Sequence, residues 1–405
     1  MEMPYSQYRD DGTALRSVAS FPDTNDAAAD RENFEPGSAG ARSAIVREAR
    51  FDDYPEIADL QRKYGLDPKN YEEWSHLWLH NPAYCSRDGW PIGWVLKNSC
   101  GDVVGYIGNI PLLYELRGQT ILAATGRAFV VSSDYRNYSC MLLGKFFGQQ
   151  DVDLFLNTTV NAQAMGAYGL FRATRVPVGE WDRTAFWVTN AHGFTRSYLK
   201  SKSLPSASLL AFPLAPAVRL HSFVRNRRLQ YDRGVKVDPC FEFDERFDHF
   251  WESLRRSTPR LVGRRDSRSL AWHFKYPFAC NRVWVYTIGT KSRIDAYAIF
   301  LRDDNKAFGL TRIRLIDFQA LGDRHSLLLP LLDQALQRCK QEKIHMLEII
   351  GYCPEKRSAV DRFIPYRRTL SSWMYFYRAR CRDLAEVLAD PGAWDPSGFD
   401  GDSSF

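Results

Sequence analysis

One order of strands and helices occurs twice along this chain, and it limits the fold more than any other feature of the sequence. Over residues 92–172, three β-rich apolar segments precede a helix, a further strand and a second helix. The same order returns over residues 283–363. Strands that alternate with helices at this spacing predict mixed α/β layers, and the repetition predicts two lobes of similar build. A chain of 405 residues is also long enough to form two hydrophobic cores.

The expected elements follow from apolar periodicity and turn residues. In the first lobe, strands are expected at residues 44–50, 92–97, 103–116, 120–131, 153–159 and twice within 175–189, and helices at 54–64, 71–80, about 137–150 and 161–172. In the second lobe, strands are expected at residues 283–289, 294–301, 309–318, 345–350 and 372–380, and helices at 244–256, 325–341 and 355–363. The predicted divisions are a flexible tail (1–41), a first lobe (42–200), a linker (201–240), a second lobe (241–385) and an acidic tail (386–405) whose Trp394 and Phe405 are able to dock.

Composition limits the expected cellular location of the protein and the chemical class of its partners. The chain carries a net charge of +6, which favours an anionic partner such as coenzyme A phosphates, acidic glycans, anionic lipid or tRNA. Its eight cysteines are scattered without a CxxC pair, and the first residues lack the pattern of a secretory signal, so we expect a cytoplasmic location. His76 and His80 have helical spacing but lack the glutamate of a zinc protease, so no metal site is expected.

An apolar run, Leu209–Val218, is followed by several arginines in the predicted linker. One interpretation is a helix that lies on anionic lipid, which leaves peripheral membrane contact open. The other, which is the commoner case, is a linker with a solvated basic face.

The stretch of residues 125–172 carries the most chemical information. A strand ends in Phe129, Val130 and Val131, and the next loop enters a helix at Asn137 or Tyr138. The unpaired N–H groups and positive dipole of a helix N-terminus can bind a pyrophosphate. Arg136 in that loop adds a charge that pairs well with phosphate oxygens.

Asn161, Ala164 and Tyr168 follow at spacings of i, i+3 and i+7, which predicts one helical face. Together with the strand and loop before them, these residues resemble the GNAT superfamily of acyl-CoA-dependent N-acyltransferases. That family has an Arg/Gln-x-x-Gly-x-Gly/Ala loop after a strand and an Asn-x-x-Ala-x-x-x-Tyr motif on a later helix. The second motif is complete here, whereas the first matches only at Arg136, because Ser139 and Met141 occupy the glycine positions. A Cβ at those positions brings side-chain atoms toward the phosphates.

The resemblance implies a fold of two tandem GNAT-like lobes, each a mixed twisted sheet flanked by helices, and an acyl-CoA site in the first lobe. It implies that Tyr168 protonates the leaving thiolate. The implied cofactor-binding residues are Phe129, Val130, Val131, Arg136, Asn137, Tyr138, Ser139, Cys140, Asn161 and Ala164. By resemblance, tandem proteins of this kind also occur in bacterial envelope-polysaccharide pathways.

The predicted activity is the transfer of an acyl group, with acetyl favoured, from acyl-CoA to an amine acceptor by direct attack. Glu115, Glu180, Asp182 and water are candidates for the base that accepts the amine proton. Two alternatives remain open. One is a Fem-type transferase that uses aminoacyl-tRNA, although the complete Asn/Tyr motif favours coenzyme A over nucleic acid. The other is a scaffold or binding protein whose catalytic site has decayed.

The second lobe lacks these features. Its corresponding loop, residues 317–324, carries acids where phosphate would bind, and Phe363 occupies the place of the motif tyrosine. We therefore expect a structural or acceptor-binding role for this lobe. Its arginine cluster either binds an anionic acceptor or forms a solvated face and ion pairs. The cluster consists of Arg255, Arg256, Arg260, Arg264, Arg265 and Arg268.

Overall fold

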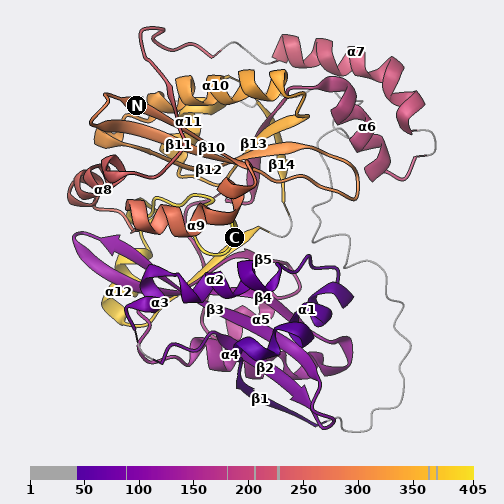
Figure 1. Cartoon of the computed structure of the whole chain (residues 1–405), viewed down its shortest axis with the longest axis vertical. Helices are drawn as coiled ribbons and strands as arrows, with labels where there is room; N and C mark the ends of the chain where they lie inside the picture. Colours follow the sequence, from indigo (N-terminus) through magenta and orange to yellow (C-terminus); the bar gives the residue numbers. More distant parts are fainter. Residues whose placement is uncertain are drawn as a thin grey trace, which may run out of the picture.

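The computed structural model describes residues 43–87, 89–179, 181–204, 207–225, 229–363, 365–370 and 373–405. Two sheets, each accompanied by helices, follow one another along the long axis of the molecule (Figure 1). The predicted tail of residues 1–41 and the candidate base Glu180 lie outside the described residues.

The first sheet contains the strands of the predicted first lobe and two strands from later in the chain. Most neighbours pair antiparallel, and β4 and β5 pair parallel. Its order is β1 (Ala44–Glu48), β2 (Gly93–Asn98), β3 (Val103–Leu116), β4 (Gln119–Val131), β5 (Leu154–Val160), β15 (Met374–Ala379) and β6 (Thr174–Arg175), and β9 (Val262–Gly263) also pairs with β3.

The second sheet repeats this pattern. Its one parallel pair within the described residues is β12 with β13, in the same place in the order as β4 with β5. The order is β14 (Tyr366–Thr369), β7 (Arg183–Val188), β13 (Met346–Ile350), β12 (Arg312–Ala320), β11 (Ile294–Arg302), β10 (Val283–Gly289) and β8 (Asp238–Cys240).

Each lobe completes the sheet of the other. Strand β7 comes from the first half of the chain but pairs with β13 in the second sheet, while β15 comes from the second half and pairs with β5 in the first. The sequence analysis placed both strands in the lobe of their own half, and the structure corrects this. Residues 42–200 therefore do not form a closed first lobe, because separating the sheets would break two sets of strand hydrogen bonds.

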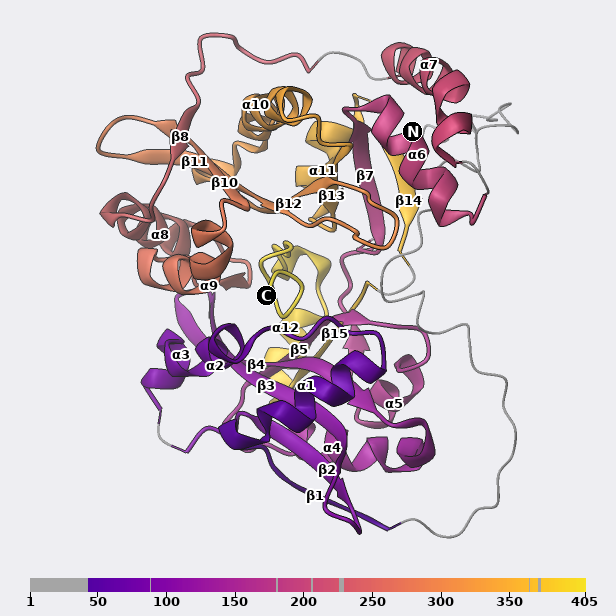
Figure 2. The same ribbon diagram turned by 45° about the vertical axis from the view of Figure 1, so that its right-hand side comes forward.

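Helices cover both sheets (Figure 2). The helices of the first lobe are α1 (Tyr54–Lys63), α2 (Tyr71–Leu79), α3 (Pro82–Cys85), α4 (Ser139–Phe147) and α5 (Met165–Leu170). Those of the second are α8 (Glu245–Ser257), α9 (Ser267–Ala279), α10 (Leu328–Gln341) and α11 (Pro354–Asp361), and α12 (Arg382–Leu388) packs against β15. The sequence analysis missed α9, which begins where the Asp266 side chain accepts a hydrogen bond from the Ser269 N–H.

The predicted linker of residues 201–240 is largely helical. Helix α6 (Ala191–Ser201) and helix α7 (Ala207–Arg225) form an antiparallel pair, with α6 beside β7 (Figure 2), and residues 238–240 form strand β8. Two prolines inside α7, Pro213 and Pro216, suggested a break in the sequence pattern, but the helix continues through both.

The predicted acidic tail is not a solvated tail. Residues 395–405 run between the two lobes in both views (Figures 1 and 2). Trp394 is buried against Tyr375 and Tyr377 of β15, and Ser397 and Asp400 are also buried. Charged partners elsewhere in the chain allow these acids to be buried, and they are described below.

Candidate active site

Strands β4 and β5 separate part of the way along their length. They pair in parallel only from Ala123 opposite Leu154 to Thr125 opposite Leu156, although both strands continue beyond this point. Within the described residues, the edge of β4 that faces β5 therefore has no strand partner over residues 126–131. We call this region the first splay. Unpaired strand edges carry free N–H and C=O groups that a ligand can use.

A bulge in β4 accompanies the separation. The register of β3 and β4 shifts between Tyr106 and Gly108, and Ala128 of β4 has a φ of 52°. A left-handed non-glycine residue is strained backbone, and β-bulges bend a strand and re-aim its side chains. Three predicted site residues, Phe129, Val130 and Val131, directly follow this bulge.

The loop after β4 leads straight into a helix, as predicted. A 3₁₀ segment (Ser133–Tyr138) joins β4 to α4, and the Ser139 N–H donates to the Arg136 carbonyl. Arg136 and Asn137 are exposed, and Tyr138, Ser139 and Cys140 are partly exposed. Met141 is exposed rather than packed in the core. The loop thus presents one guanidinium and a helix N-terminus to solvent, which suits an anionic ligand.

Tyr64 fixes this loop in place, and the sequence analysis did not identify it. Its hydroxyl lies 2.9 Å from Ser132 Oγ and accepts a hydrogen bond of 2.9 Å from the Ser133 N–H. Tyr64 is the residue directly after α1, so the contact ties α1 to the start of the loop. No local sequence signal marks such a contact between residues 68 positions apart.

The predicted helical face of Asn161, Ala164 and Tyr168 is only partly correct. Helix α5 begins at Met165, and Asn161 lies in the turn before it, where its Oδ1 accepts a hydrogen bond of 2.9 Å from the Ala164 N–H. Asparagine favours such local bonds over a helical position, which explains the later start. Asn161 therefore caps the turn rather than sharing a helical face with Tyr168.

Tyr168 is the most buried of the predicted site residues. Its side chain is 3% exposed and packs between Phe147 of α4 and Phe376 of β15. Burial raises the pKa of the Tyr168 hydroxyl, and the negative charge of Asp402 raises it further. The hydroxyl therefore stays protonated at neutral pH.

Asp402 belongs to the segment that runs between the lobes, and the sequence analysis missed it. Its carboxylate accepts hydrogen bonds from Thr158 Oγ1 (2.8 Å) and Thr159 Oγ1 (3.2 Å), both in the part of β5 beyond its pairing with β4. Arg127 Nη1 of β4 donates to the Asp402 carbonyl at 3.4 Å. The segment thus contacts both strands of the first splay at the place where they diverge.

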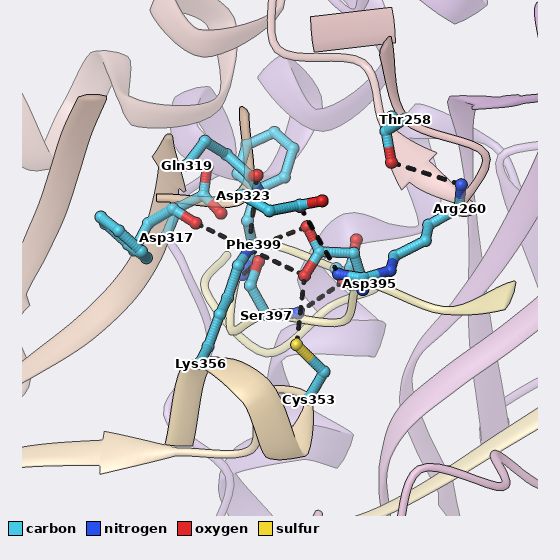
Figure 3. A network of polar contacts seen from close by, with 12 residues as sticks. Thr258, Arg260, Asp317, Gln319, Asp323, Cys353, Lys356, Asp395, Ser397 and Phe399 are labelled. Carbon is cyan, nitrogen blue, oxygen red and sulfur yellow. Dashed lines mark hydrogen bonds and ion pairs between the residues drawn. The ribbon is translucent and has the colours of Figure 1, made fainter. Parts of the chain in front are cut away.

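The same segment is anchored in the second lobe by one buried ion pair and by a hydrogen bond from the arginine of a second, neighbouring ion pair (Figure 3). Lys356 Nζ of α11 lies 2.7 Å from Asp395 Oδ1, and Arg265 Nε donates to Asp317 Oδ2 at 2.8 Å. Arg265 also donates to Ser397 Oγ at 3.1 Å. Every one of these side chains is buried, so each charge depends on its partner.

Strands β12 and β13 also separate, and this second splay is filled. Their pairing ends at Leu315 opposite Ile349, while β12 continues to Ala320. Lys356 Nζ donates to the carbonyl of Phe318 (3.0 Å) and to Gln319 Oε1 (3.3 Å) in the unpaired part of β12. A lysine side chain of the protein itself thus bonds to the unpaired part of β12 in the second splay.

The arginine cluster of the second lobe consists largely of ion pairs. Its members pair with neighbouring or facing acids, which favours the structural interpretation over an acceptor site. The pairs are Arg255 and Arg256 with Glu252, Arg260 with Asp323, Arg264 with Asp266, and Arg265 with Asp317.

Among the described residues, neither Glu115 nor Asp182 forms a hydrogen bond or ion pair with Tyr168. Glu115 is opposite Thr120 near the β3–β4 turn, at the end of β4 away from the first splay, and it accepts a hydrogen bond from Thr120. Asp182 forms an ion pair with Arg175. His76 is buried, with Nε2 3.0 Å from the Trp272 carbonyl.

Comparison with known proteins supports the fold. No protein-family model and no curated protein matches the sequence. Solved structures do match, although their sequence identity is so low that they show the fold alone. They include a GCN5-related N-acetyltransferase from Kribbella flavida (TM-score 0.52, 10% identity, 85% of this chain and 72% of that chain). They also include N-myristoyltransferase from Saccharomyces cerevisiae with bound myristoyl-CoA (TM-score 0.53, 13% identity, 87% and 86%) and a probable N-acyltransferase from Enterococcus faecalis (TM-score 0.51, 10% identity, 84% and 72%). The predicted fold class of two tandem GNAT-like lobes is therefore confirmed.

Proposed function

We propose that this protein is an acyl-CoA-dependent N-acyltransferase with its donor site at the first splay. One observation carries the proposal. The buried, protonated Tyr168 belongs to the same lobe as an unpaired strand edge and an exposed helix N-terminus. These are the parts that a thioester donor needs, because its pantetheine arm resembles a peptide and its pyrophosphate is anionic.

The donor is proposed to bind along β4. Backbone groups of Phe129–Val131 would hydrogen-bond to the pantetheine arm, and Arg136 together with the N–H groups at the start of α4 would hold the pyrophosphate. Arg136 is exposed and has no ion-pair partner among the described residues, so its charge is free for this role. Asn161 would contribute mainly by holding the turn that leads into α5.

The proposed reaction is a direct transfer. The acceptor amine attacks the thioester carbonyl, the C–S bond breaks, and Tyr168 donates its hydroxyl proton to the leaving sulfur. A tyrosine of ordinary pKa is already protonated at neutral pH, so the raised pKa of Tyr168 keeps the proton in place and does not make the hydroxyl a stronger acid. The proton lost by the amine balances the one that Tyr168 donates.

Acetyl-CoA and longer acyl-CoAs are both candidate donors. Of the structural neighbours, one is named as an acetyltransferase and another was solved with myristoyl-CoA. All eight cysteines are free, which supports the proposed cytoplasmic location. The Fem-type alternative loses support, because the arginines that would bind tRNA are largely paired with acids.

Calorimetric titration with acetyl-, octanoyl- and myristoyl-CoA tests the donor site. We expect micromolar binding of at least one donor, and we expect Arg136→Ala to weaken it about tenfold, the loss of a charge-assisted contact. Arg268→Ala, which removes an exposed arginine from α9, is the matched control and should bind normally.

A thiol-release assay with a panel of amino sugars, amino acids and peptides then tests the chemistry. Release of coenzyme A that requires both donor and amine would support the transferase. Donor binding without release for any amine would instead support the scaffold alternative, and absence of binding to every acyl-CoA would refute the donor site.

A further inference from the structure

Helices α6 and α7 form a hairpin at the outer edge of the second lobe. In Figure 1, α7 is the outermost element at the upper right, beyond α6 and strand β14. The hairpin interrupts the lobe between β7 and β8, and it adds no strand to either sheet. Its role therefore lies outside the shared two-lobe architecture.

Helix α7 buries small side chains and exposes large apolar ones, which is the reverse of an ordinary surface helix. The side that faces the protein consists mainly of small residues, namely Ala207, Ala211, Ala215, Val218 and Ser222. The outward side carries large apolar residues, with Phe212 78% exposed, Leu209 75% exposed and Leu220 64% exposed, together with Leu210 and Leu214. Soluble helices place large apolar residues against the core, and contiguous exposed apolar patches mark interaction sites.

The charge that the hairpin itself carries has a single sign. From Thr184 to Tyr231 the sequence contains seven Lys and Arg residues and no Asp or Glu. Three of these cations, Lys200, Lys202 and Arg219, are exposed on the hairpin within the described residues. An apolar strip on a hairpin whose own charges are all basic fits an anionic bilayer, where apolar side chains enter the acyl boundary and cations meet phosphates.

We propose that the α6–α7 hairpin docks the protein on an anionic phospholipid bilayer, with the outward side of α7 in the headgroup boundary. A second copy of this chain is a less suitable partner for the outward side of α7, because a twofold contact would bring the same positive charges together. The attachment is peripheral, since among the described helices there is none that is both long and apolar enough to cross a bilayer. This inference does not depend on the proposed acyltransferase activity.

Vesicle flotation tests the proposal with the full chain. Wild type should float with vesicles of 70% phosphatidylcholine and 30% phosphatidylglycerol, and much less with phosphatidylcholine alone. The double variant Leu209→Ser/Phe212→Ser should lower the partition coefficient at least about tenfold, because two large apolar side chains leave the boundary. The matched control is Ile45→Ser/Phe241→Ser, which removes two equally exposed apolar residues elsewhere and should float like wild type.

A second set of variants tests the charges. The triple variant Lys200→Gln/Lys202→Gln/Arg219→Gln should weaken binding by about fivefold for each cation removed, and high salt should weaken wild type in the same way. Sedimentation velocity without vesicles should show that wild type and the Leu209→Ser/Phe212→Ser variant have the same size.

Three results would overturn the proposal. They are absence of wild-type binding to anionic vesicles, equal binding by both double variants, and a wild-type dimer that the α7 variant alone abolishes. The last result would assign α7 to a second copy of the chain. Circular dichroism before each experiment verifies that the variants are folded.

Discussion

The two splays occupy the same place in two sheets of the same order, yet only the second has a lysine side chain bonded to its unpaired strand. In the second lobe, Lys356 enters the opening and bonds to Phe318, Gln319 and Asp395. In the first lobe, the side chain that bridges the strands is Asn157, whose Nδ2 lies 3.4 Å from the Gly126 carbonyl, and the strand edge beyond it stays unpaired. Two sheets with the same strand order therefore differ in the side chains that occupy the place where their parallel strands separate.

The segment of residues 395–405 accounts for much of this difference. It enters the second lobe through the buried ion pair of Asp395 with Lys356 and a hydrogen bond from Arg265 to Ser397, whereas it reaches the first lobe through hydrogen bonds from Thr158, Thr159 and Arg127 to Asp402. A buried ion pair is costly to break, while neutral hydroxyl contacts are weaker. We infer that the second lobe fixes the position of the segment. In the first lobe, the segment places Asp402 close enough to raise the pKa of Tyr168.

The largest expected effect is on catalysis in the first lobe. Tyr168→Phe should lower kcat by about 10²- to 10⁴-fold, because the leaving thiolate loses its proton donor, while acyl-CoA affinity stays unchanged. Steady-state kinetics for kcat, with calorimetry for donor affinity, measures both quantities.

The matched control uses a buried tyrosine of the second lobe. Tyr352 follows β13, is 2% exposed, and has a hydroxyl without a hydrogen-bond partner among the described residues. Tyr352→Phe should therefore leave kcat intact. If Tyr352→Phe reduces kcat as much as Tyr168→Phe does, the functional division between the lobes is wrong.

The next effect is on stability, and it tests whether the second lobe holds the segment. Lys356→Met removes the cation that fills the second splay and leaves Asp395 buried without its partner. We expect a loss of about 3–5 kcal/mol in the free energy of unfolding, measured by urea denaturation. The double variant Lys356→Met/Asp395→Leu should recover most of this loss, because neither charge remains buried. A single variant as stable as wild type would show that this ion pair does not anchor the segment.

Much of the fold could be predicted from the sequence, and particular elements show why. Strands β3 and β10 are found at their predicted bounds, because each is a continuous β-rich run between turn residues. The exchange of β7 and β15 could not be predicted, since a local pattern identifies a strand but not its partner. A helix was only one of two interpretations for the run that forms α7, because Pro213 and Pro216 are ordinarily helix breakers.

In the candidate site too, local sequence patterns reveal the motif residues but not the contacts between residues that are far apart in the chain. Arg136 and Tyr168 belong to local motifs and could be found by spacing. Tyr64 and Asp402 act on residues 68 and 244 positions away, respectively, so only the fold brings them to the site. The acids of residues 395–405 look solvated in the sequence, because the cations near them are distant along the chain, namely Lys356 of α11 for Asp395 and Arg127 of β4 for Asp402.

The smallest expected effect concerns Asp400, which lies in the same segment between the lobes. Burial raises the pKa of this carboxyl to about 6, and its Oδ1 has no hydrogen-bond partner among the described residues. A folded pKa above the unfolded one means that the folded state binds more protons between about pH 4 and pH 6, so this group's contribution to stability falls as pH rises through that window. Asp400→Asn should abolish this fall in the free energy of unfolding. The variant should therefore be more stable than wild type by roughly 2–3 kcal/mol at pH 7.

Urea denaturation of wild type and Asp400→Asn at pH 4, 5, 6 and 7 measures this effect. The two proteins should be nearly equal in stability at pH 4, and the gap should grow up to pH 7. The asparagine keeps an acceptor for the Ser397 N–H, which Asp400 Oδ2 now accepts at 2.8 Å, so the backbone turn is preserved. If the variant is less stable than wild type at pH 7, then attraction between Asp400 and the nearby Arg265 outweighs the cost of burial. In that case Asp400 holds the segment by charge, as Asp395 does in the second lobe. The two lobes would then differ only in that Lys356 occupies the second splay.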